Sequence, residues 1–178
     1  MATQFEEGTA RPFRGRYGLE GLSGRAILSR DTIKFEKFEA RHGDSRMTFN
    51  GEVSRSEGRR VCTLQVEGRN LRFEDELLDL MPATHNPARR LHELVSRARP
   101  SGLFDAALDL YMKDERPIAY RLELRPASID FDLADRRIAL SQVEGRAIVT
   151  PEKIVIDDAA ATFDGERYAA NGTVTLGA

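Results

Sequence analysis

Apolar and polar residues alternate with a period of two along most of the chain. Residues 104–112 are an example, because Phe104, Leu108 and Leu110 are separated by polar or small residues. Such alternation is typical of antiparallel strands that have one apolar and one solvated face. The pattern predicts strands near residues 15–20, 25–29, 32–41, 46–54, 60–66, 104–112, 118–125, 129–133, 137–149, 153–163 and 167–176.

One stretch breaks this alternation and has apolar residues at helical spacing instead. It comprises residues 74–81 and 87–98, which are rich in leucine. Asn86 is suited to cap the second segment and Pro87 to occupy its first turn. The sequence therefore predicts a short insert of two helices near residues 74–98.

The chain also contains an internal repeat. Residues 24–53 align without a gap to residues 145–174, an offset of 121 residues, and ten of the thirty positions are identical. Repeated segments of this kind indicate structural units that pack side by side. The identical positions are Gly24/Gly145, Arg25/Arg146, Ala26/Ala147, Ile27/Ile148, Ile33/Ile154, Ala40/Ala161, Arg46/Arg167, Asn50/Asn171, Gly51/Gly172 and Val53/Val174.

Both copies lose their alternation at the same place. Two charged residues follow the apolar pair in each copy, Glu36 with Lys37 in the first and Asp157 with Asp158 in the second. The apolar phase then shifts by one residue, which is the effect of a β-bulge. Bulges bend and twist a strand, so the pattern predicts a curved sheet.

These observations together predict a mainly β protein built from repeats. Its curved antiparallel sheet forms either an open, taco-like groove or a closed sandwich, because the same alternation fits both. We expect a flexible N-terminal segment over residues 1–14 and one domain over residues 15–178. Within that domain the first copy covers about residues 16–53 and the second about residues 137–174.

Composition and charge exclude several classes of function. The 178 residues include 27 basic and 29 acidic side chains, a formal net charge of −2, which gives no reason to expect a nucleic-acid partner. Cys62 is the sole cysteine, so neither a disulfide framework nor a thiolate zinc site is available. With three histidines and no clustered ligands, no metal, cofactor or catalytic site is expected.

Short motifs that resemble active sites have simpler interpretations. His42, Asp44 and Ser45 are too close in sequence for a catalytic triad, and they fit a hairpin turn better. His85 and His92 lack further ligands at metal-binding spacing. The Asn-Gly pairs at residues 50–51 and 171–172 suit a type I′ turn, but the alternation continues past both. We therefore expect each glycine within or beside a strand.

The sequence contains no evident targeting signal. The first ten residues are polar and acidic, and no segment has the roughly 20 apolar residues needed to cross a bilayer. Two expectations remain: a cytoplasmic protein if the chain is complete, or an internal piece of a longer one.

The repeat resembles that of AsmA-like and TamB-like bacterial envelope proteins. The resemblance is carried by residues 145–176, GRAIVTPEKIVIDDAAATFDGERYAANGTVTL, and by their earlier copy. Residues 66–77 are similar to the family's passage from a strand into a helix, and residues 100–105 to its return to the sheet. The similarity covers about residues 15–177.

The resemblance implies a fold, a ligand and a location. Proteins of this family are long and membrane-anchored, and their β-groove is thought to hold or conduct phospholipid across the periplasm. By implication, this chain is an internal module of such an envelope protein. Its partners would be a phospholipid or another acyl-chain ligand, envelope proteins, and neighbouring repeats of the parent chain.

Three hypotheses about function follow, the first being a non-enzymatic lipid-binding or lipid-conducting module. The second is a structural or interaction module with a closed core that binds partners through its edge strands. In the third, Glu123, Asp130 and Asp132 act on sugars as paired carboxylates. The groove positions implied by the first are Ile27, Ile33, Phe35, Phe38, Leu108, Leu110, Tyr120, Leu122, Ile129, Phe131, Ile148, Ile154 and Ile156.

Overall fold

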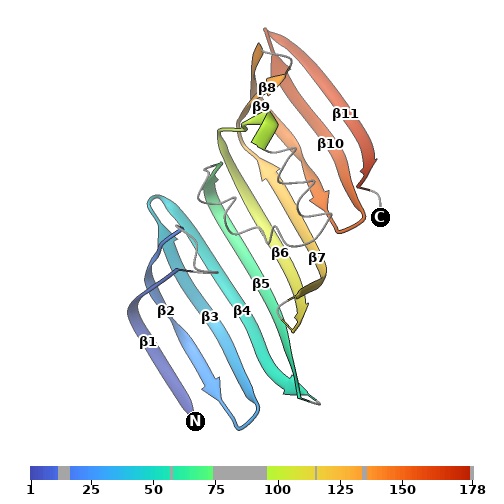
Figure 1. The fold of residues 1–178 in the computed structure, drawn as a ribbon. Coiled ribbons are helices and arrows are strands. Elements are labelled where there is room, and N and C mark those ends of the chain that lie inside the picture. Colours follow the sequence, from blue (N-terminus) through green and yellow to red (C-terminus); the bar gives the residue numbers. More distant parts are fainter. Residues whose placement is uncertain (12–16, 57, 74–95, 115, 134–135, 177–178) are drawn as a thin grey trace.

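The computed structural model describes residues 1–11, 17–56, 58–73, 96–114, 116–133 and 136–176. These residues form one antiparallel sheet of eleven strands (Figure 1). The strands are β1 (Ala2–Ala10), β2 (Leu19–Leu28), β3 (Thr32–His42), β4 (Ser45–Ser56), β5 (Arg59–Arg72), β6 (Leu103–Lys113), β7 (Arg116–Pro126), β8 (Ile129–Leu133), β9 (Arg136–Val149), β10 (Lys153–Phe163) and β11 (Glu166–Thr175).

The sheet is an open meander in which strands that follow each other in sequence are usually neighbours. Its order is β1-β2-β3-β4-β5-β6-β7-β9-β10-β11, and β8 pairs with β9 beside this path. Strands β1 and β11 lie at opposite ends and do not pair, so the sheet is not closed (Figure 1). The prediction of a mainly β, antiparallel protein is confirmed.

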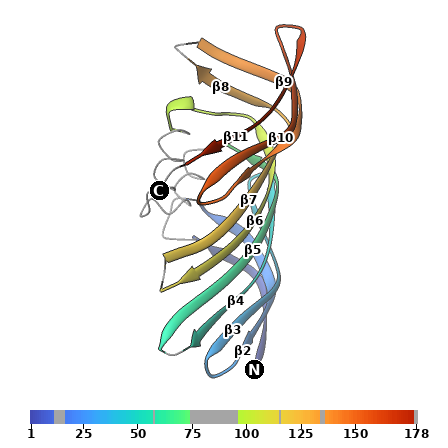
Figure 2. The ribbon, with the colours of Figure 1, turned by 90° about the vertical axis from the view of Figure 1, so that its right-hand side faces the viewer.

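Strand β9 pairs with two different strands along one of its edges. Its first half pairs with β8, whereas residues 147–149 pair with residues 122–124 of β7. Figure 2 shows that β9 bends between these halves, so that β8 and the start of β9 turn away from the other strands. Gln142, which has a positive φ of 51°, lies between these two paired segments of β9.

The structure differs from the sequence prediction near the N-terminus. Residues 1–14 were expected to be a flexible segment, but Ala2–Ala10 form β1 and pair with β2. Strand β2 also continues through the gap expected between residues 20 and 25. The predicted helices at 74–81 and 87–98 lie mostly outside the described residues, and only residues 96–98 form a helical turn there.

Both predicted β-bulges are confirmed. The register of β3 with β4 shifts between Phe35 and Phe38, and that of β10 with β11 shifts between Ile156 and Ala159. Lys37 and Asp158, the residues inserted at these shifts, each have a φ of 49°. A left-handed residue of this kind bends the strand and lets the apolar side chains return to the same face.

An asparagine on the next strand satisfies the backbone of each bulge. The Lys37 N–H donates to Asn50 Oδ1 at 2.8 Å, and the Asp158 N–H donates to Asn171 Oδ1 at 2.6 Å. These N–H groups have left the regular ladder, and an unpaired N–H would weaken the sheet. This role explains why both copies have Asn before Gly, and both Asn-Gly pairs lie inside strands as expected.

Glycine on the other neighbouring strand provides space for each bulge. A Cβ atom on Gly145 would lie 2.4 Å from the carbonyl oxygen of Asp158, and one on Gly24 would lie 2.6 Å from Cγ of Phe38. Gly145 also has a φ of 90°, which a side chain disfavours. The identical glycines of the two copies therefore have the same steric role.

The buried core lies towards one end of the first strands, between the sheet and residues preceding β2. Phe104 stacks on Phe73 with ring centroids 4.2 Å apart, and Tyr17 stacks on His42 at 4.0 Å. The cluster joins β2 to β6 through side chains from distant parts of the chain. Its buried members are Tyr17, Leu19, Ala40, Met47, Leu71 and Phe104.

We predict that Gly145→Ala destabilises the protein by at least about 2 kcal/mol, because its methyl group would meet the carbonyl of Asp158 at a strained φ. Urea unfolding followed by circular dichroism measures this change. Gly18→Ala is the control, since a Cβ atom at Gly18 has no neighbour within 4 Å. Equal stability of the two variants would contradict the proposed role of Gly145.

Candidate functional site

The register of the strands aligns apolar side chains into a continuous row on one face of the sheet. In antiparallel pairs, directly opposite residues point to the same face. The row crosses eight strands, from β3 to β11, and at about 4.8 Å per strand it is roughly 34 Å long. We call it the apolar row; it consists of Phe38, Phe49, Val66, Leu108, Leu122, Val149, Ile154 and Val174.

Two parallel rows widen this face on one side of the apolar row. One of them continues from Ala26 through β3 to β7. The other begins at Leu28 and Ile33, which are each 39 % exposed. We call the three rows together the apolar face. The members of the two flanking rows are Ala26, Phe35, Gly51, Leu64, Leu110 and Tyr120 in one, and Leu28, Ile33, Val53, Cys62 and Met112 in the other.

Much of the apolar face remains accessible to solvent. The chain exposes 11983 Å², whereas a compact chain of 20.0 kDa exposes roughly 8,700 Å². Phe38 and Val149 of the apolar row are buried, but Val174 at its end is 51 % exposed, and the middle of the row is half-buried. An exposed apolar area of this kind is typical of a ligand or partner surface.

Most of the positions expected to line a groove lie on the apolar side of the sheet. Nine of them belong to the main strands, and Ile129 and Phe131 belong to β8, where they pair with Leu140 and Ile138 of β9. The nine are Ile33, Phe35, Phe38, Leu108, Leu110, Tyr120, Leu122, Ile154 and Ile156. Ile156 extends the face beyond Ala147, its partner on β9.

Ile27 and Ile148 were assigned to this face incorrectly. Ile27 lies opposite Lys34, and Ile148 lies opposite Glu123, so both point to the polar side. The alternation places their small neighbours, the alanines at 26 and 147, on the apolar side instead. Side-chain size misled the assignment, because an isoleucine can occupy an otherwise polar face and leave alanine to the apolar one.

Some residues that complete the apolar row were not among the predicted groove positions. Phe49, Val66 and Val149 connect the assigned positions across β4, β5 and β9. Their alternation was visible in the sequence, but the register between the strands was needed to join them into one row.

Two polar groups lie on the apolar face. The Tyr120 hydroxyl is buried and makes no hydrogen bond among the described residues. Burial, with a smaller effect from the charge of Glu152, raises the pKa of Tyr120, so its phenol remains a protonated donor. Burial likewise raises the pKa of the Cys62 thiol and keeps it neutral.

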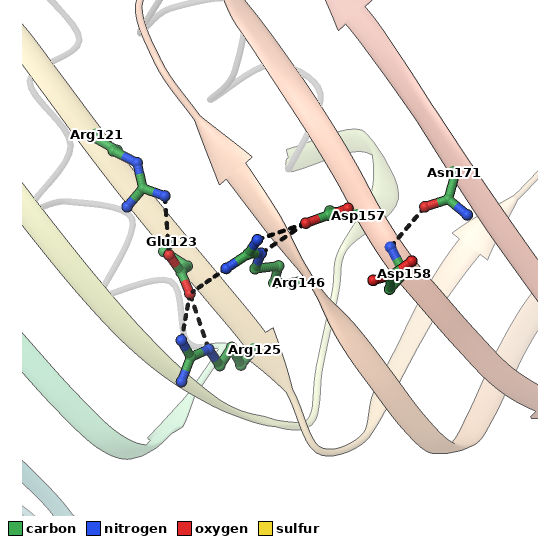
Figure 3. Close-up of polar contacts among 7 residues, drawn as sticks. All are labelled: Arg121, Glu123, Arg125, Arg146, Asp157, Asp158 and Asn171. Atoms are coloured by element: carbon green, nitrogen blue, oxygen red, sulfur yellow. Dashed lines mark hydrogen bonds and ion pairs between the residues drawn. The ribbon is translucent and has the colours of Figure 1, made fainter.

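The opposite face carries a network of ion pairs centred on Glu123 (Figure 3). Glu123 is buried, with 7 % of the residue exposed. Its carboxylate accepts a hydrogen bond from Arg125 at 2.6 Å and forms an ion pair with Arg121 at 3.1 Å. Arg146 lies 3.9 Å from the same carboxylate and donates to Asp157 at 2.7 Å. Arg125 is the largest cause of the lowered pKa of Glu123, which Arg121 reinforces.

Two of the carboxylates considered for sugar chemistry, those of Glu123 and Asp132, are held by arginine. Asp132 pairs with Arg99 and Arg137, and the hydrogen bond from Arg137 is the largest cause of its lowered pKa. A general acid needs the opposite shift, a raised pKa. Glu123 and Asp132 are therefore placed to remain ionised at neutral pH.

The remaining motifs have structural roles or lie outside the described residues. Gly43 and Asp44 form the predicted hairpin turn, the His42 ring contacts the Gly18 carbonyl at 2.7 Å, and the Ser45 hydroxyl donates to the Asn70 carbonyl at 2.9 Å. His85 and His92 fall in the undescribed range 74–95. The described part of the chain contains no cluster of three potential metal ligands, and none of its helices is long and apolar enough to cross a membrane.

We predict that Glu123→Gln lowers the free energy of unfolding at pH 7 by about 1 kcal/mol, since its arginine partners are themselves largely exposed. The lowered pKa of Glu123 adds stability above its ordinary value of 4.5, and this stability is lost as the pH falls through the folded-state pKa.

The stability difference between wild type and Glu123→Gln should therefore narrow as the pH falls below about 4.5. Urea titrations of both proteins across this range measure it. A difference that stays constant from pH 7 to pH 3 would show that the Glu123 charge does not stabilise the fold.

Comparison with family models, curated proteins and solved structures gave no match to this chain.

Proposed function

We propose that this chain is a non-enzymatic module of a larger cell-envelope protein and that its apolar face binds the acyl chains of lipids. The observation that carries the proposal is the uninterrupted apolar row across eight strands. No charged residue interrupts it. A conducting groove built from repeats, as in the AsmA-like and TamB-like proteins, is the finer form of this proposal.

The dimensions of the row suit a long, narrow apolar ligand. Its length of roughly 34 Å is close to the 30 Å thickness of the hydrocarbon core of a bilayer. Burial of each methylene contributes about 0.8 kcal/mol, so eight methylenes contribute about 6 kcal/mol. Association itself costs at least about 4 kcal/mol, which means that short chains bind weakly and long chains are favoured.

The polar features of the sheet fit a ligand on one side only. The ion-paired network of Glu123, Arg125 and Arg146 on the opposite face is suited to contact with water. On the apolar face, the Tyr120 hydroxyl has no hydrogen-bond partner among the described residues, and a bound lipid would offer it an acceptor such as an ester carbonyl. That bond would remove the cost of a buried polar group without a partner.

We predict that Ile33→Asp weakens binding of a fluorescent long-chain fatty acid, cis-parinaric acid, at least tenfold. Each tenfold change corresponds to about 1.4 kcal/mol, less than the cost of covering a carboxylate with an acyl chain. Ile33 is 39 % exposed, so the substitution is compatible with folding. Fluorescence titration measures the affinity, and mass spectrometry of the native protein reveals lipid that copurifies.

Ile27→Asp is the matched control, because it makes the same substitution on the polar face, opposite Lys34. It should bind the fatty acid as wild type does. Equal loss of binding in the two variants would show that the effect is not specific to the apolar face. Failure of the wild-type protein to bind any acyl chain would refute the proposed function.

A further inference from the structure

The hairpins β3–β4 and β10–β11 have the same geometry. Ile33 pairs with Val53 as Ile154 pairs with Val174, and the same offset of 121 residues relates all their register pairs outside the turns. Their bulges are also equivalent, with the same φ and the same asparagine hydrogen bond. Strands β4 and β11 are therefore equivalent, and the surroundings of their outer edges can be compared residue by residue.

The outer sides of the hairpins differ. Strand β4 is covered along its length by β5, which places Leu64 opposite Gly51. A Cβ atom on Gly51 would lie 2.6 Å from the carbonyl oxygen of Thr63, so the approach of β5 requires glycine there. Gly172 occupies the equivalent place in β11, yet a Cβ atom there would have no neighbour within 4 Å.

The structure around Gly172 thus gives no steric reason for a glycine. Glycine inside a strand weakens it, because it adds conformational freedom to the unfolded chain and has no side chain to pack. The equivalent glycine in β4, Gly51, is explained by the close approach of β5. The same explanation applies to Gly172 if a strand docks along β11.

The two edges of the sheet are also unequal. Strand β1 carries Glu6 and Glu7, and Glu7 has a φ of 54° at a register shift, so charge and a bulge both protect this edge. All ten residues of β11 are exposed, and residues 168–175 contain no charged side chain and no proline. A long uncharged edge is a template for pairing with another strand.

From these observations we propose that the outer edge of β11 is a binding site for one antiparallel strand from another polypeptide, added in the register that β5 has on β4. The partner segment has the chemistry of β5, with apolar and polar residues alternating. It places a leucine-sized side chain opposite Gly172 and smaller apolar ones opposite Ala170 and Val174. The proposal is independent of lipid binding.

A second copy of this chain does not meet these requirements. Two β11 strands that pair symmetrically about Gly172 place glycine opposite glycine. Such a pair gives no steric reason for the absence of a Cβ atom at Gly172. Strand β1 of a second copy brings the two charges and the bulge at Glu7 into the ladder. The favoured occupant is therefore a regular alternating strand.

The β5 segment itself provides a probe. A fluorescein-labelled peptide of residues 59–72, RRVCTLQVEGRNLR, should bind the intact chain under reducing conditions, as measured by fluorescence anisotropy. Gly172→Ala should weaken this binding at least tenfold, because its methyl group meets the carbonyl of the added strand. The same variant should keep or raise the unfolding midpoint, since nothing occupies that space in the free chain.

Thr173→Ala is the matched control, because Thr173 pairs with Val155 and lies on the polar side. Its affinity for the peptide should equal that of wild type. Equal affinities of Gly172→Ala and wild type, or no peptide binding at all, would overturn the proposal. Dimerisation of the chain alone that Gly172→Ala abolishes, detected by analytical ultracentrifugation, would assign the edge to a second copy and overturn it too.

The register can be tested with the cysteine of the peptide. Cys62 lies opposite Val53 in the structure, so the peptide cysteine should lie opposite Val174. In a protein that carries Cys62→Ser, Val174→Cys should therefore form a disulfide with the peptide in glutathione buffer, whereas Ala170→Cys, four residues away, should not. Equal cross-linking at both positions would refute the register.

Discussion

An inserted residue that bends a strand also changes the face to which the later side chains point, so each bulge must match the alternation of apolar residues in the sequence. This constraint governs the present structure. At Lys37 and at Asp158 the inserted residue adopts a left-handed conformation, and the next apolar side chain returns to the original face. Without that residue, every side chain beyond the bend would point to the other side.

The bulges impose requirements on both neighbouring strands. On one side, a glycine such as Gly145 leaves room for the displaced carbonyl, and on the other, Asn171 accepts the N–H that has left the ladder. Asn70, with a φ of 55°, is bonded similarly to Asp105. The residues shared by the two copies are thus explained largely by backbone geometry, whereas the side chains between them differ.

The sequence was sufficient to predict features that depend on local alternation. Most strands, the two bulges and the position of the Asn-Gly pairs within strands followed from the period of two. Strand β1 was missed because its residues are mostly polar, and its only large apolar side chain before the bulge is Phe5, 42 % exposed. It is held by pairing with β2, which alternation within residues 1–14 does not reveal.

The candidate site was harder to predict, because it depends on the register between paired strands. Single strands showed which residues alternate, but the register decided that Phe49 and Val66 join Leu108 in one row. Register also decided that Ile27 faces Lys34. The openness of the sheet was not predictable either, since the same alternation suits a closed sandwich.

The order of the strands has a consequence for folding. Most strands pair with the next strand in sequence, and β7 with β9 is the exception along the main path of the described sheet. Apart from β5 and β6, which residues 73–102 separate, such pairs close short loops, and closure of a short loop costs little chain entropy. The entropic barrier typical of all-β proteins arises mainly from contacts between distant residues. A meander of this kind can therefore grow strand by strand from either end of a hairpin, each new strand using the previous one as its template.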